Sequence, residues 1–169
     1  MKSCKGRIWK LGNDVNTDQI IPGRYLDNYS PSHLASHALE GARKDFAGAV
    51  RAGDIVLAGR NFGCGSSREQ AVMALVHSGV RSVVAQSYAR IFYRNAINLG
   101  LYAFSSAEAY ESFEDGEVAV IDLEAGTITS EDRTRAVRLG SIPEKAQEIL
   151  KYGGLVPYIK ATLAKSRDD

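Results

Sequence analysis

Short apolar runs and amphipathic stretches alternate along most of the chain. The apolar runs at residues 54–59, 80–85 and 101–104 predict buried strands, and residues 5–11 are a further candidate strand. Apolar side chains at helical spacing separate these runs and predict two helices, one from Ala71, Val72, Leu75 and Val76 and another from Tyr88, Ile91, Phe92, Ala96 and Leu99. Strands that alternate with helices in this way predict an α/β fold.

Polar residues dominate the stretch between the first two predicted strands. Residues 13–22 and 22–32 predict two polar loops, and a helix is expected at residues 32–39. His33 and His37 would share one face of that helix, but no Glu or Cys stands at a spacing that would complete a metal site. These two histidines therefore do not predict a bound metal.

The C-terminal third carries a hairpin signal and two helices. Residues 117–123 and 127–129 flank Glu-Ala-Gly, which predicts two strands joined by a tight turn and adds a β-rich element. Pro143 is expected to begin a helix that Gly153 and Gly154 end, and residues 155–165 are expected to form a last helix.

Residues 61–70, with the sequence Asn-Phe-Gly-Cys-Gly-Ser-Ser-Arg-Glu-Gln, carry the candidate chemistry. Ser66 and Ser67 lie between a predicted strand and a predicted helix, where ligands commonly bind in open α/β sheets. The start of a helix has unpaired N–H groups and a partial positive charge. Arg68 adds a planar guanidinium that suits a carboxylate or a phosphate. The pattern therefore predicts an anion-binding site.

Structural roles for the same residues stay open at this point. Ser66 followed by Glu69 matches a capping box, in which the serine would only cap the helix. Cys64, between two glycines and near Arg68, is either an activated thiol or a small packing residue. The spacing excludes a P-loop, a dinucleotide fingerprint and a nucleophile elbow, because the required Lys or Gly is missing from each.

Composition narrows the class of protein. The chain has 169 residues, 44% of them hydrophobic and 24% charged, which predicts a single globular domain over residues 1–169. A net charge of +1 gives no reason to expect a nucleic-acid partner or an anionic membrane, and no apolar run is long enough to span a membrane. No signal-peptide pattern follows Met1, so a cytoplasmic location is expected. Cys4 and Cys64 are too few for a disulfide framework or for an iron–sulfur or zinc site.

Residues 61–69 resemble the signature of the small-subunit family of 3-isopropylmalate dehydratases, which corresponds to the swivelling domain of the aconitase superfamily. Residues 14–22, Asp-Val-Asn-Thr-Asp-Gln-Ile-Ile-Pro, followed by Arg-Tyr-Leu at 24–26, resemble the opening of that family. Residues 87–98 resemble its central helix, and residues 153–155 resemble its closing helix pair. The resemblance extends in order over nearly the whole chain and implies a swivelling β/β/α domain.

The resemblance implies one half of a two-chain hydro-lyase. A separate large subunit would hold a [4Fe-4S] cluster on three cysteines, so that this chain would carry no cofactor of its own. The small subunit would close over the cluster and complete the active site. The reaction would move water on a small hydroxy diacid through an unsaturated intermediate, converting 2-isopropylmalate to 3-isopropylmalate in leucine biosynthesis. Self-association of the isolated chain stays open.

The resemblance also implies roles for individual side chains. Ser66 would be the general base, acting as an alkoxide, which requires strongly positive surroundings because a serine hydroxyl is a very weak acid. Ser67 and Arg68 would bind a substrate carboxylate. Asp18 would help to organise the catalytic site, and Arg24 would be a second ligand for a carboxylate.

The loop formed by Tyr25, Leu26, Asp27 and Asn28 would select the substrate. An apolar residue after the Tyr-Leu pair would suit an isopropyl group and an arginine would suit an extra carboxylate, but Asp27 is neither. An inward carboxylate would repel a further carboxylate on the substrate, whereas an Asp27 that faces solvent would select nothing. Gln70 stands where many family members have histidine.

Four alternatives therefore remain at the level of sequence. The chain could be the small subunit of a homoaconitase, or of a dehydratase for citraconate or 2,3-dimethylmalate. The Leu-Asp-Asn sequence also resembles aconitase itself, which acts on a tricarboxylate. In a different class, the chain could be a non-catalytic anion-binding module that regulates a partner.

Overall fold

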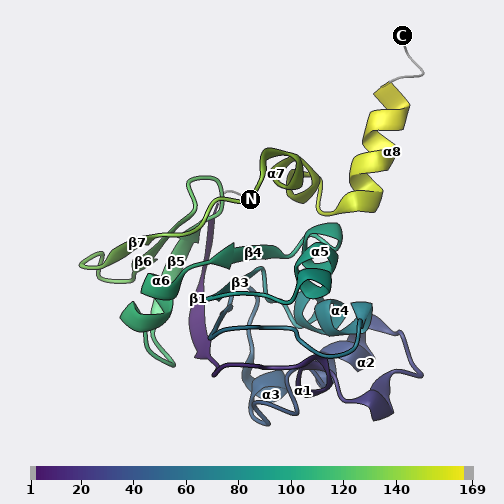
Figure 1. The fold of residues 1–169 in the computed structure, drawn as a ribbon, viewed down its shortest axis with the longest axis horizontal. Helices are drawn as coiled ribbons and strands as arrows, with labels where there is room; N and C mark the ends of the chain where they lie inside the picture. The colour runs from purple at the N-terminus through teal and green to yellow at the C-terminus, as the bar shows by residue number, and fades with distance from the viewer. Residues whose placement is uncertain (1–2, 166–169) are drawn as a thin grey trace.

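One mixed sheet organises residues 3–165, the part of the chain that the computed structural model describes. Its strand order is β4–β3–β2–β1–β5–β6–β7 (Figure 1). The strands are β1 (Ser3–Lys10), β2 (Ile55–Ala58), β3 (Ser82–Ala85), β4 (Tyr102–Ser105), β5 (Val118–Asp122), β6 (Thr127–Ser130) and β7 (Ala136–Arg138).

The two halves of the sheet differ in strand direction, because one is parallel and the other antiparallel. Strands β1 to β4 are parallel, with Ile8 opposite Ile55 and Ile55 opposite Ser82. Strand β5 pairs with β1 in the antiparallel sense and continues into β6 and β7. The predicted α/β class is confirmed, as are the predicted strands and the hairpin between β5 and β6.

Helices occupy most of the connections between the strands. They are α1 (Thr17–Ile20), the 3-10 turn η1 (Gly23–Tyr25), α2 (Pro31–Ser36), α3 (Phe46–Ala49), α4 (Glu69–His77), α5 (Arg90–Asn98), α6 (Ala107–Ser112), α7 (Glu144–Lys151) and α8 (Leu155–Lys165). Pro143 precedes α7, and Gly153 and Gly154 separate it from α8, as the sequence predicts. Helix α8 extends away from the rest of the molecule (Figure 1).

Apolar side chains cover both faces of the parallel half of the sheet. Along β2 the side chains alternate, so that Val56 and Ala58 join one buried cluster while Ile55 and Leu57 join another. The first cluster takes in the apolar faces of α2 and α4, and the second packs against β5, β6, α6 and α7. A strand that is buried on both sides reads as a continuous apolar run, which is why β2 and β3 were recognisable in the sequence.

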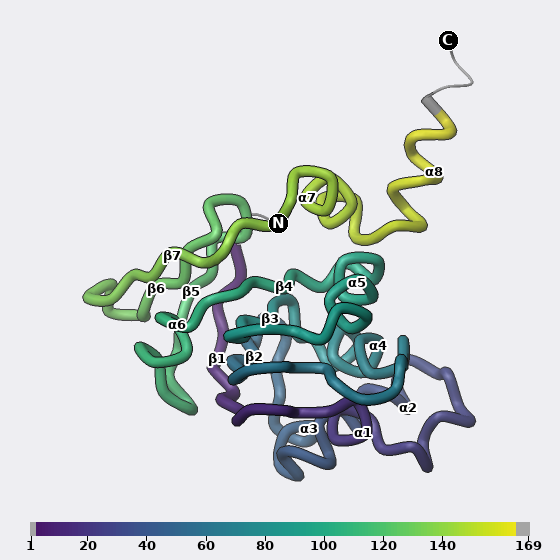
Figure 2. Tube along the Cα trace, in the orientation of Figure 1, coloured from purple at the N-terminus to yellow at the C-terminus, as the bar shows by residue number. Residues whose placement is uncertain are grey.

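Because β1, β2 and β3 are parallel, the segments that follow them leave the sheet at the same edge. Two isolated bridges join these segments, one between Asn16 and Cys64 and one between Phe62 and Tyr88. In Figure 2 the segments that follow β1, β2 and β3 are coloured purple, blue and teal. The residues of the candidate site therefore come together at the carboxyl ends of the central strands.

Some short elements differ from the prediction. The loop expected at residues 13–22 contains α1, and the loop expected at 22–32 contains η1. The helix expected at 32–39 ends at Ser36, and Leu39 has a positive φ of 55° that a helix cannot continue through. Elements α3, α6 and β7 were not predicted. Within the described residues, no helix has both the length and the apolar character needed to cross a membrane.

Candidate functional site

The serine loop, residues 61–68, is held on one side by the segment that leads into α1. The main-chain N–H of Gly63 donates to the carbonyl oxygen of Val15 at 2.8 Å. The N–H of Thr17 donates to the carbonyl oxygen of Cys64 at 2.9 Å. These bonds continue the parallel pairing beyond the ends of β1 and β2, so the sheet itself places the loop.

The segment after β3 holds the other side of the serine loop. The N–H of Phe62 donates to the carbonyl oxygen of Ser87 at 3.0 Å, and the N–H of Ala89 donates to that of Phe62 at the same distance. The ring of Phe62 is fully buried and meets the ring of Phe92 edge to face, with centroids 5.1 Å apart. The loop is therefore anchored to two neighbouring segments and to the core beneath it.

The glycines of the serine loop have a steric cause. Gly63 has a φ of 79°, and a Cβ atom there would lie 2.2 Å from Cγ of Phe92. Gly65 also has a positive φ, of 90°. Only glycine adopts this conformation readily, and only glycine allows the backbone to approach Phe92 so closely. The Gly-Cys-Gly sequence is thus required by the turn that presents the serines.

Neither serine caps the helix that follows. Helix α4 begins at Glu69, and its N-cap residue is Arg68, which makes no side-chain capping bond. Ser66 and Ser67 are exposed, and within residues 3–165 their hydroxyl groups make no hydrogen bond. The capping-box interpretation is therefore wrong, because the helix starts too late for Ser66 to reach its first N–H groups. Both hydroxyls are left available to a ligand.

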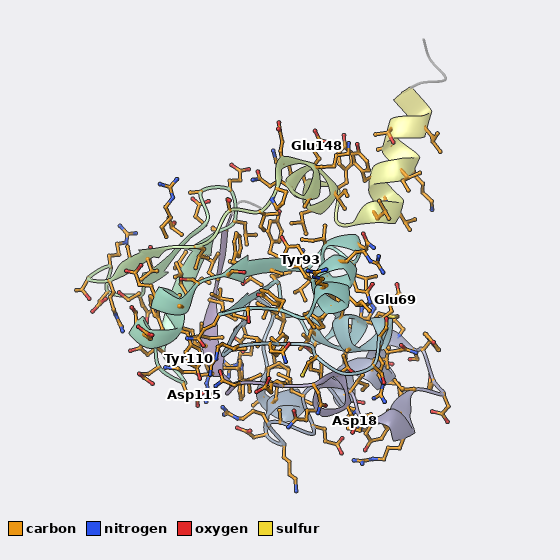
Figure 3. The ribbon with its side chains drawn as sticks, in the orientation of Figure 1. Asp18, Glu69, Tyr93, Tyr110, Asp115 and Glu148 are labelled. Carbon is orange, nitrogen blue, oxygen red and sulfur yellow. The ribbon has the colours of Figure 1, made fainter. Side chains whose placement is uncertain are left out.

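Arg68 reaches back across the loop to Asp18 on α1. Its Nη1 donates to Oδ1 of Asp18 at 2.9 Å and to the carbonyl oxygen of Ile21 at 3.2 Å. The bond from Arg68, together with one from the N–H of Gly23, holds the pKa of Asp18 below its usual range. Asp18 is labelled in Figure 3 near the lower edge of the molecule. The structure therefore brings Asp18 and Arg68 together.

A hollow of about 300 Å³ lies over the serine loop. The first turn of α5 lines this hollow together with the serine loop. The N-termini of two helices, α4 and α5, therefore border the same space. Its lining includes Ser66, Ser67 and Arg68, and also Arg90 and Asn95, which the sequence analysis did not select. Two arginines and two helix starts make this hollow suited to a carboxylate.

Arg24 lies elsewhere. It lines a second hollow, of about 730 Å³, together with Asp18, Glu40 and Lys44. Its guanidinium forms an ion pair with Glu40 and lies 4.7 Å from the ring centre of Tyr25. The structure does not bring Arg24 into the hollow of the serines, so its expected role as a carboxylate ligand is not supported by this arrangement. Asp18 borders one hollow and its partner Arg68 borders the other.

The expected specificity loop is fixed at its first residue and open at its tip. The ring of Tyr25 stacks on His37 with centroids 3.6 Å apart, and its hydroxyl donates to Glu40 at 3.0 Å. Leu26 packs partly against the core. Asp27 is exposed and, among the described residues, makes no hydrogen bond or ion pair.

Two further side chains hold the end of this region. The Oδ1 of Asn28 accepts a bond from the N–H of Ser30 at 2.9 Å. Tyr29 accepts a hydrogen bond from Nε2 of Gln70, so the position that departs from the family pattern links the polar loop to α4. The region from Tyr25 to Tyr29 is therefore attached to the body at both ends.

Besides Arg90 and Asn95, sequence reasoning missed two more neighbours of the expected site residues, Glu40 and Thr17. Glu40 binds Arg24, Tyr25 and His37, but nothing in the sequence pattern indicates this convergence. Thr17 was not selected because the sequence analysis treated its segment as a loop and did not predict α1. The signal was present, because Asn16 and Gln19 form a capping box in which each side chain bonds the other's main-chain N–H.

The described residues include no group of three or more His, Cys, Asp or Glu side chains that could hold a metal ion. Cys4 is buried in the core, with its Sγ 3.5 Å from Oγ of Ser82, whereas Cys64 is half-buried in the serine loop. The side chains at the site can hydrogen-bond an organic anion, and among the described residues they do not form a set of metal ligands.

Comparison with known proteins places these features in a family. Residues 14–109 match the aconitase C-terminal domain family. The 3-isopropylmalate dehydratase small subunit of Thermodesulfovibrio yellowstonii is 46% identical over 95% of both chains. The methanogen homoaconitase small subunit of Methanothermobacter thermautotrophicus is 50% identical over 94% of this chain and 92% of its own. The crystal structure of 3-isopropylmalate dehydratase (leuD) from Methanocaldococcus jannaschii superposes with a TM-score of 0.92 and 43% identity, over 99% of each chain.

Proposed function

Because this chain belongs to the family of 3-isopropylmalate dehydratase small subunits, within the aconitase superfamily, we propose that Ser66 is the general base of a hydro-lyase that interconverts 2-isopropylmalate and 3-isopropylmalate. The single swivelling domain, residues 1–169, closes over a large subunit. One observation carries the assignment of the base. Ser66 and Ser67 present hydroxyl groups that have no hydrogen-bond partner among the described residues, in the hollow that Arg68 also lines.

Within this chain, Ser67 and Arg68 bind the substrate and Ser66 transfers the proton. Ser67 and Arg68 hold a carboxylate of the substrate, since only one terminal nitrogen of the guanidinium is bonded to Asp18 and Ile21. Ser66 Oγ removes the proton from the carbon next to the departing hydroxyl. The electron pair of that C–H bond forms the double bond as the C–O bond breaks, the proton stays on Ser66 Oγ, and the hydroxyl leaves as hydroxide, which becomes water by taking up a proton from solvent. Re-addition reverses these steps with the groups exchanged.

Positive charge around Ser66 has to favour the alkoxide. Arg68 and Arg90 line the same hollow, and α5 begins beside it. Asp18 orients Arg68 and stays ionised, because the bond from Arg68 keeps the pKa of Asp18 low. The small subunit thus contributes a positively charged surface, formed by Arg68 and Arg90, that can bind a diacid.

The large subunit supplies the [4Fe-4S] cluster, which would act as a Lewis acid toward the departing hydroxyl. The described part of this chain offers hydroxyl, guanidinium and carboxylate groups at the site rather than the three cysteine ligands that such a cluster needs. The hollow over the serine loop is open to the exterior, which suits a partner that completes it. Activity is therefore a property of the two-chain complex.

A homoaconitase-type reaction is the second candidate, since a small subunit with that name is 50% identical. Its substrate carries one more carboxylate than isopropylmalate. Asp27, exposed at the tip of the expected specificity loop, opposes a further carboxylate when it faces the substrate. We therefore place isopropylmalate first.

The test is an anaerobic reconstitution with the cognate large subunit, followed by the absorbance of the unsaturated intermediate. Isopropylmalate, homocitrate, citramalate, 2,3-dimethylmalate and citrate are compared. Ser66→Ala is expected to lower turnover by about 10²–10⁴-fold while the pair still assembles. Ser78→Ala is the matched control, because the Ser78 hydroxyl donates to the carbonyl oxygen of Leu75 at the end of α4, away from the serine loop.

Each outcome separates two hypotheses. Turnover of isopropylmalate that depends on Ser66 and not on Ser78 supports the proposal. A preference for another diacid would reassign the substrate while keeping the chemistry. A wild-type pair that assembles, binds the diacids and turns over none of them would show instead an anion-binding regulatory module.

A further inference from the structure

Thr17 is a buried polar residue that touches the serine loop at two points. Only 3% of its surface is exposed. Its Oγ1 donates to the carbonyl oxygen of Ser66 at 2.9 Å, and its N–H donates to the carbonyl oxygen of Cys64 at 2.9 Å. The hydroxyl bond is a contact between side chain and main chain across 49 positions of sequence.

Ser66 needs such an anchor because its own side chain provides none. Its hydroxyl makes no hydrogen bond within residues 3–165, so the orientation of Oγ depends on how its peptide is held. The preceding residue, Gly65, has no side chain to restrain the turn. A Cβ at Gly65 would lie 3.5 Å from Oγ1 of Thr17, an ordinary contact distance, so the turn lies next to that hydroxyl.

We propose that Thr17 is a positioning residue for the reaction: its buried hydroxyl fixes the Ser66 peptide and thereby aims Ser66 Oγ into the hollow. The inference rests on the proposed role of Ser66 as the base. Thr17 also borders the hollow, but we assign it no role as an acid or a base, since its hydroxyl proton is already donated to the Ser66 carbonyl. Its effect on the reaction is therefore geometric, and a misplaced base lowers the rate of the chemical step.

The position of Thr17 predicts a small effect on substrate binding. Carboxylate binding is assigned to Arg68, which is oriented by Asp18 and Ile21 and not by Thr17. Loss of the Thr17 hydroxyl therefore changes where Ser66 points while Arg68 keeps its partners. We expect a fall in kcat with little change in KM.

The experiment compares Thr17→Val, which keeps the shape but cannot donate, with Thr17→Ser, which keeps the hydroxyl. Kinetics are measured on the reconstituted pair, and hydrogen exchange of residues 61–69 is measured on the isolated small subunit. Thr162→Val is the control, because its hydroxyl also bonds a main-chain carbonyl, that of Tyr158, on α8.

The expected result is a fall of about ten- to a hundredfold in kcat for Thr17→Val, recovery in Thr17→Ser, and no change in Thr162→Val. Exchange of residues 61–69 should be faster in Thr17→Val only. If the valine variant does not assemble, Thr17→Ala and Thr17→Ser form a second comparison, since both lack the methyl group and differ in the hydroxyl alone.

Unchanged kcat in an assembled Thr17→Val pair would overturn the inference, as would equal losses in the Ser and Val variants. Failure of the proposed function looks different, because the wild-type pair would then show no turnover. In that case the exchange measurement decides whether Thr17 holds the serine loop, and unchanged exchange would overturn that statement too.

Discussion

Nη1 of Arg68 lies 2.9 Å from Oδ1 of Asp18, although the two residues are 50 positions apart. The bond joins the end of the serine loop to the four-residue helix α1. The same nitrogen also donates to Ile21, so the remaining guanidinium N–H groups are left for a ligand. Asp18 therefore orients Arg68 without using its whole hydrogen-bonding capacity.

Arg68→Lys tests this arrangement. Lysine keeps the positive charge but loses the planar fork, so it cannot bond Asp18 and a ligand carboxylate in the same geometry. We expect kcat/KM of the reconstituted pair to fall by about ten- to a hundredfold, with a higher KM and a lower kcat. Steady-state kinetics checks this, with Arg138→Lys on the exposed face of β7 as the control. Kinetics equal to wild type would remove Arg68 from the site.

Glu40→Gln tests the group that holds Tyr25 and Arg24. The bonds from His37, Tyr25 and Arg24 lower the pKa of Glu40 below its ordinary value of 4.5. A lowered pKa stabilises the folded state above about pH 4.5, and that stabilisation is lost as the pH falls through the lowered value. We expect the melting temperature to drop by about 2–5 °C at pH 7, a small effect because the pair is partly exposed.

The pH dependence supplies the control for Glu40→Gln. The difference in melting temperature between wild type and variant should shrink on acidification below pH 4.5 and approach zero once Glu40 is protonated in the folded state. A difference that stays constant from pH 7 to strongly acidic solution would show that the charge of Glu40 is not what matters.

Asp27→Ala tests substrate selection. Because Asp27 is exposed and makes no hydrogen bond or ion pair within the described chain, its replacement should change the free energy of unfolding by less than about 0.5 kcal/mol. We expect the ratio of kcat/KM for homocitrate to that for isopropylmalate to rise about tenfold, since a repulsive carboxylate has been removed. Competition between the two substrates measures this ratio directly. A ratio equal to wild type would make Asp27 a bystander.

Gly63→Ala tests the turn under the serines. The new methyl group would lie 2.2 Å from Cγ of Phe92 on a backbone with a φ of 79°. Both effects destabilise the fold, and we expect a loss of about 2–4 kcal/mol in the free energy of unfolding. Denaturant unfolding measures the loss. Gly12→Ala is the matched control, because a Cβ there would meet no atom within 4 Å.

The sequence was most informative where burial dictates the pattern. Strand β2 is buried at all four positions and α4 buries Ala71, Val72 and Leu75, so period and hydrophobicity alone located both. The Gly-x-Gly pattern indicated a turn with an unusual backbone conformation, and Arg68 indicated a site for an anionic ligand. The resemblance to a family added the roles of Ser66, Ser67 and Asp18, which periodicity cannot supply.

Short elements and long-range contacts were beyond such reasoning. Helix α1 has only four residues and is held by a capping box, so no apolar periodicity marks it. The pairing of Arg24 with Glu40 depends on how η1 and α2 fold against each other, and the sequence contains no sign of it. The capping assignment for Ser66 failed for a similar reason, since a shift of the helix start by a few residues decides what a serine can reach.

Asp18 Oδ1 accepts a second hydrogen bond, from the N–H of Gly23 at 3.0 Å. Gly23 begins η1, which leads into the expected specificity loop, so one oxygen atom joins Arg68, the proposed carboxylate ligand, to that loop. A carboxylate that changes the bond between Arg68 and Asp18 therefore also changes how firmly η1 is held. By thermodynamic reciprocity, the conformation of the loop must then alter the affinity of Arg68 for the carboxylate to the same extent. If Arg68 and this loop contact the two ends of a diacid, as we propose, recognition of those ends is energetically coupled within this one small chain.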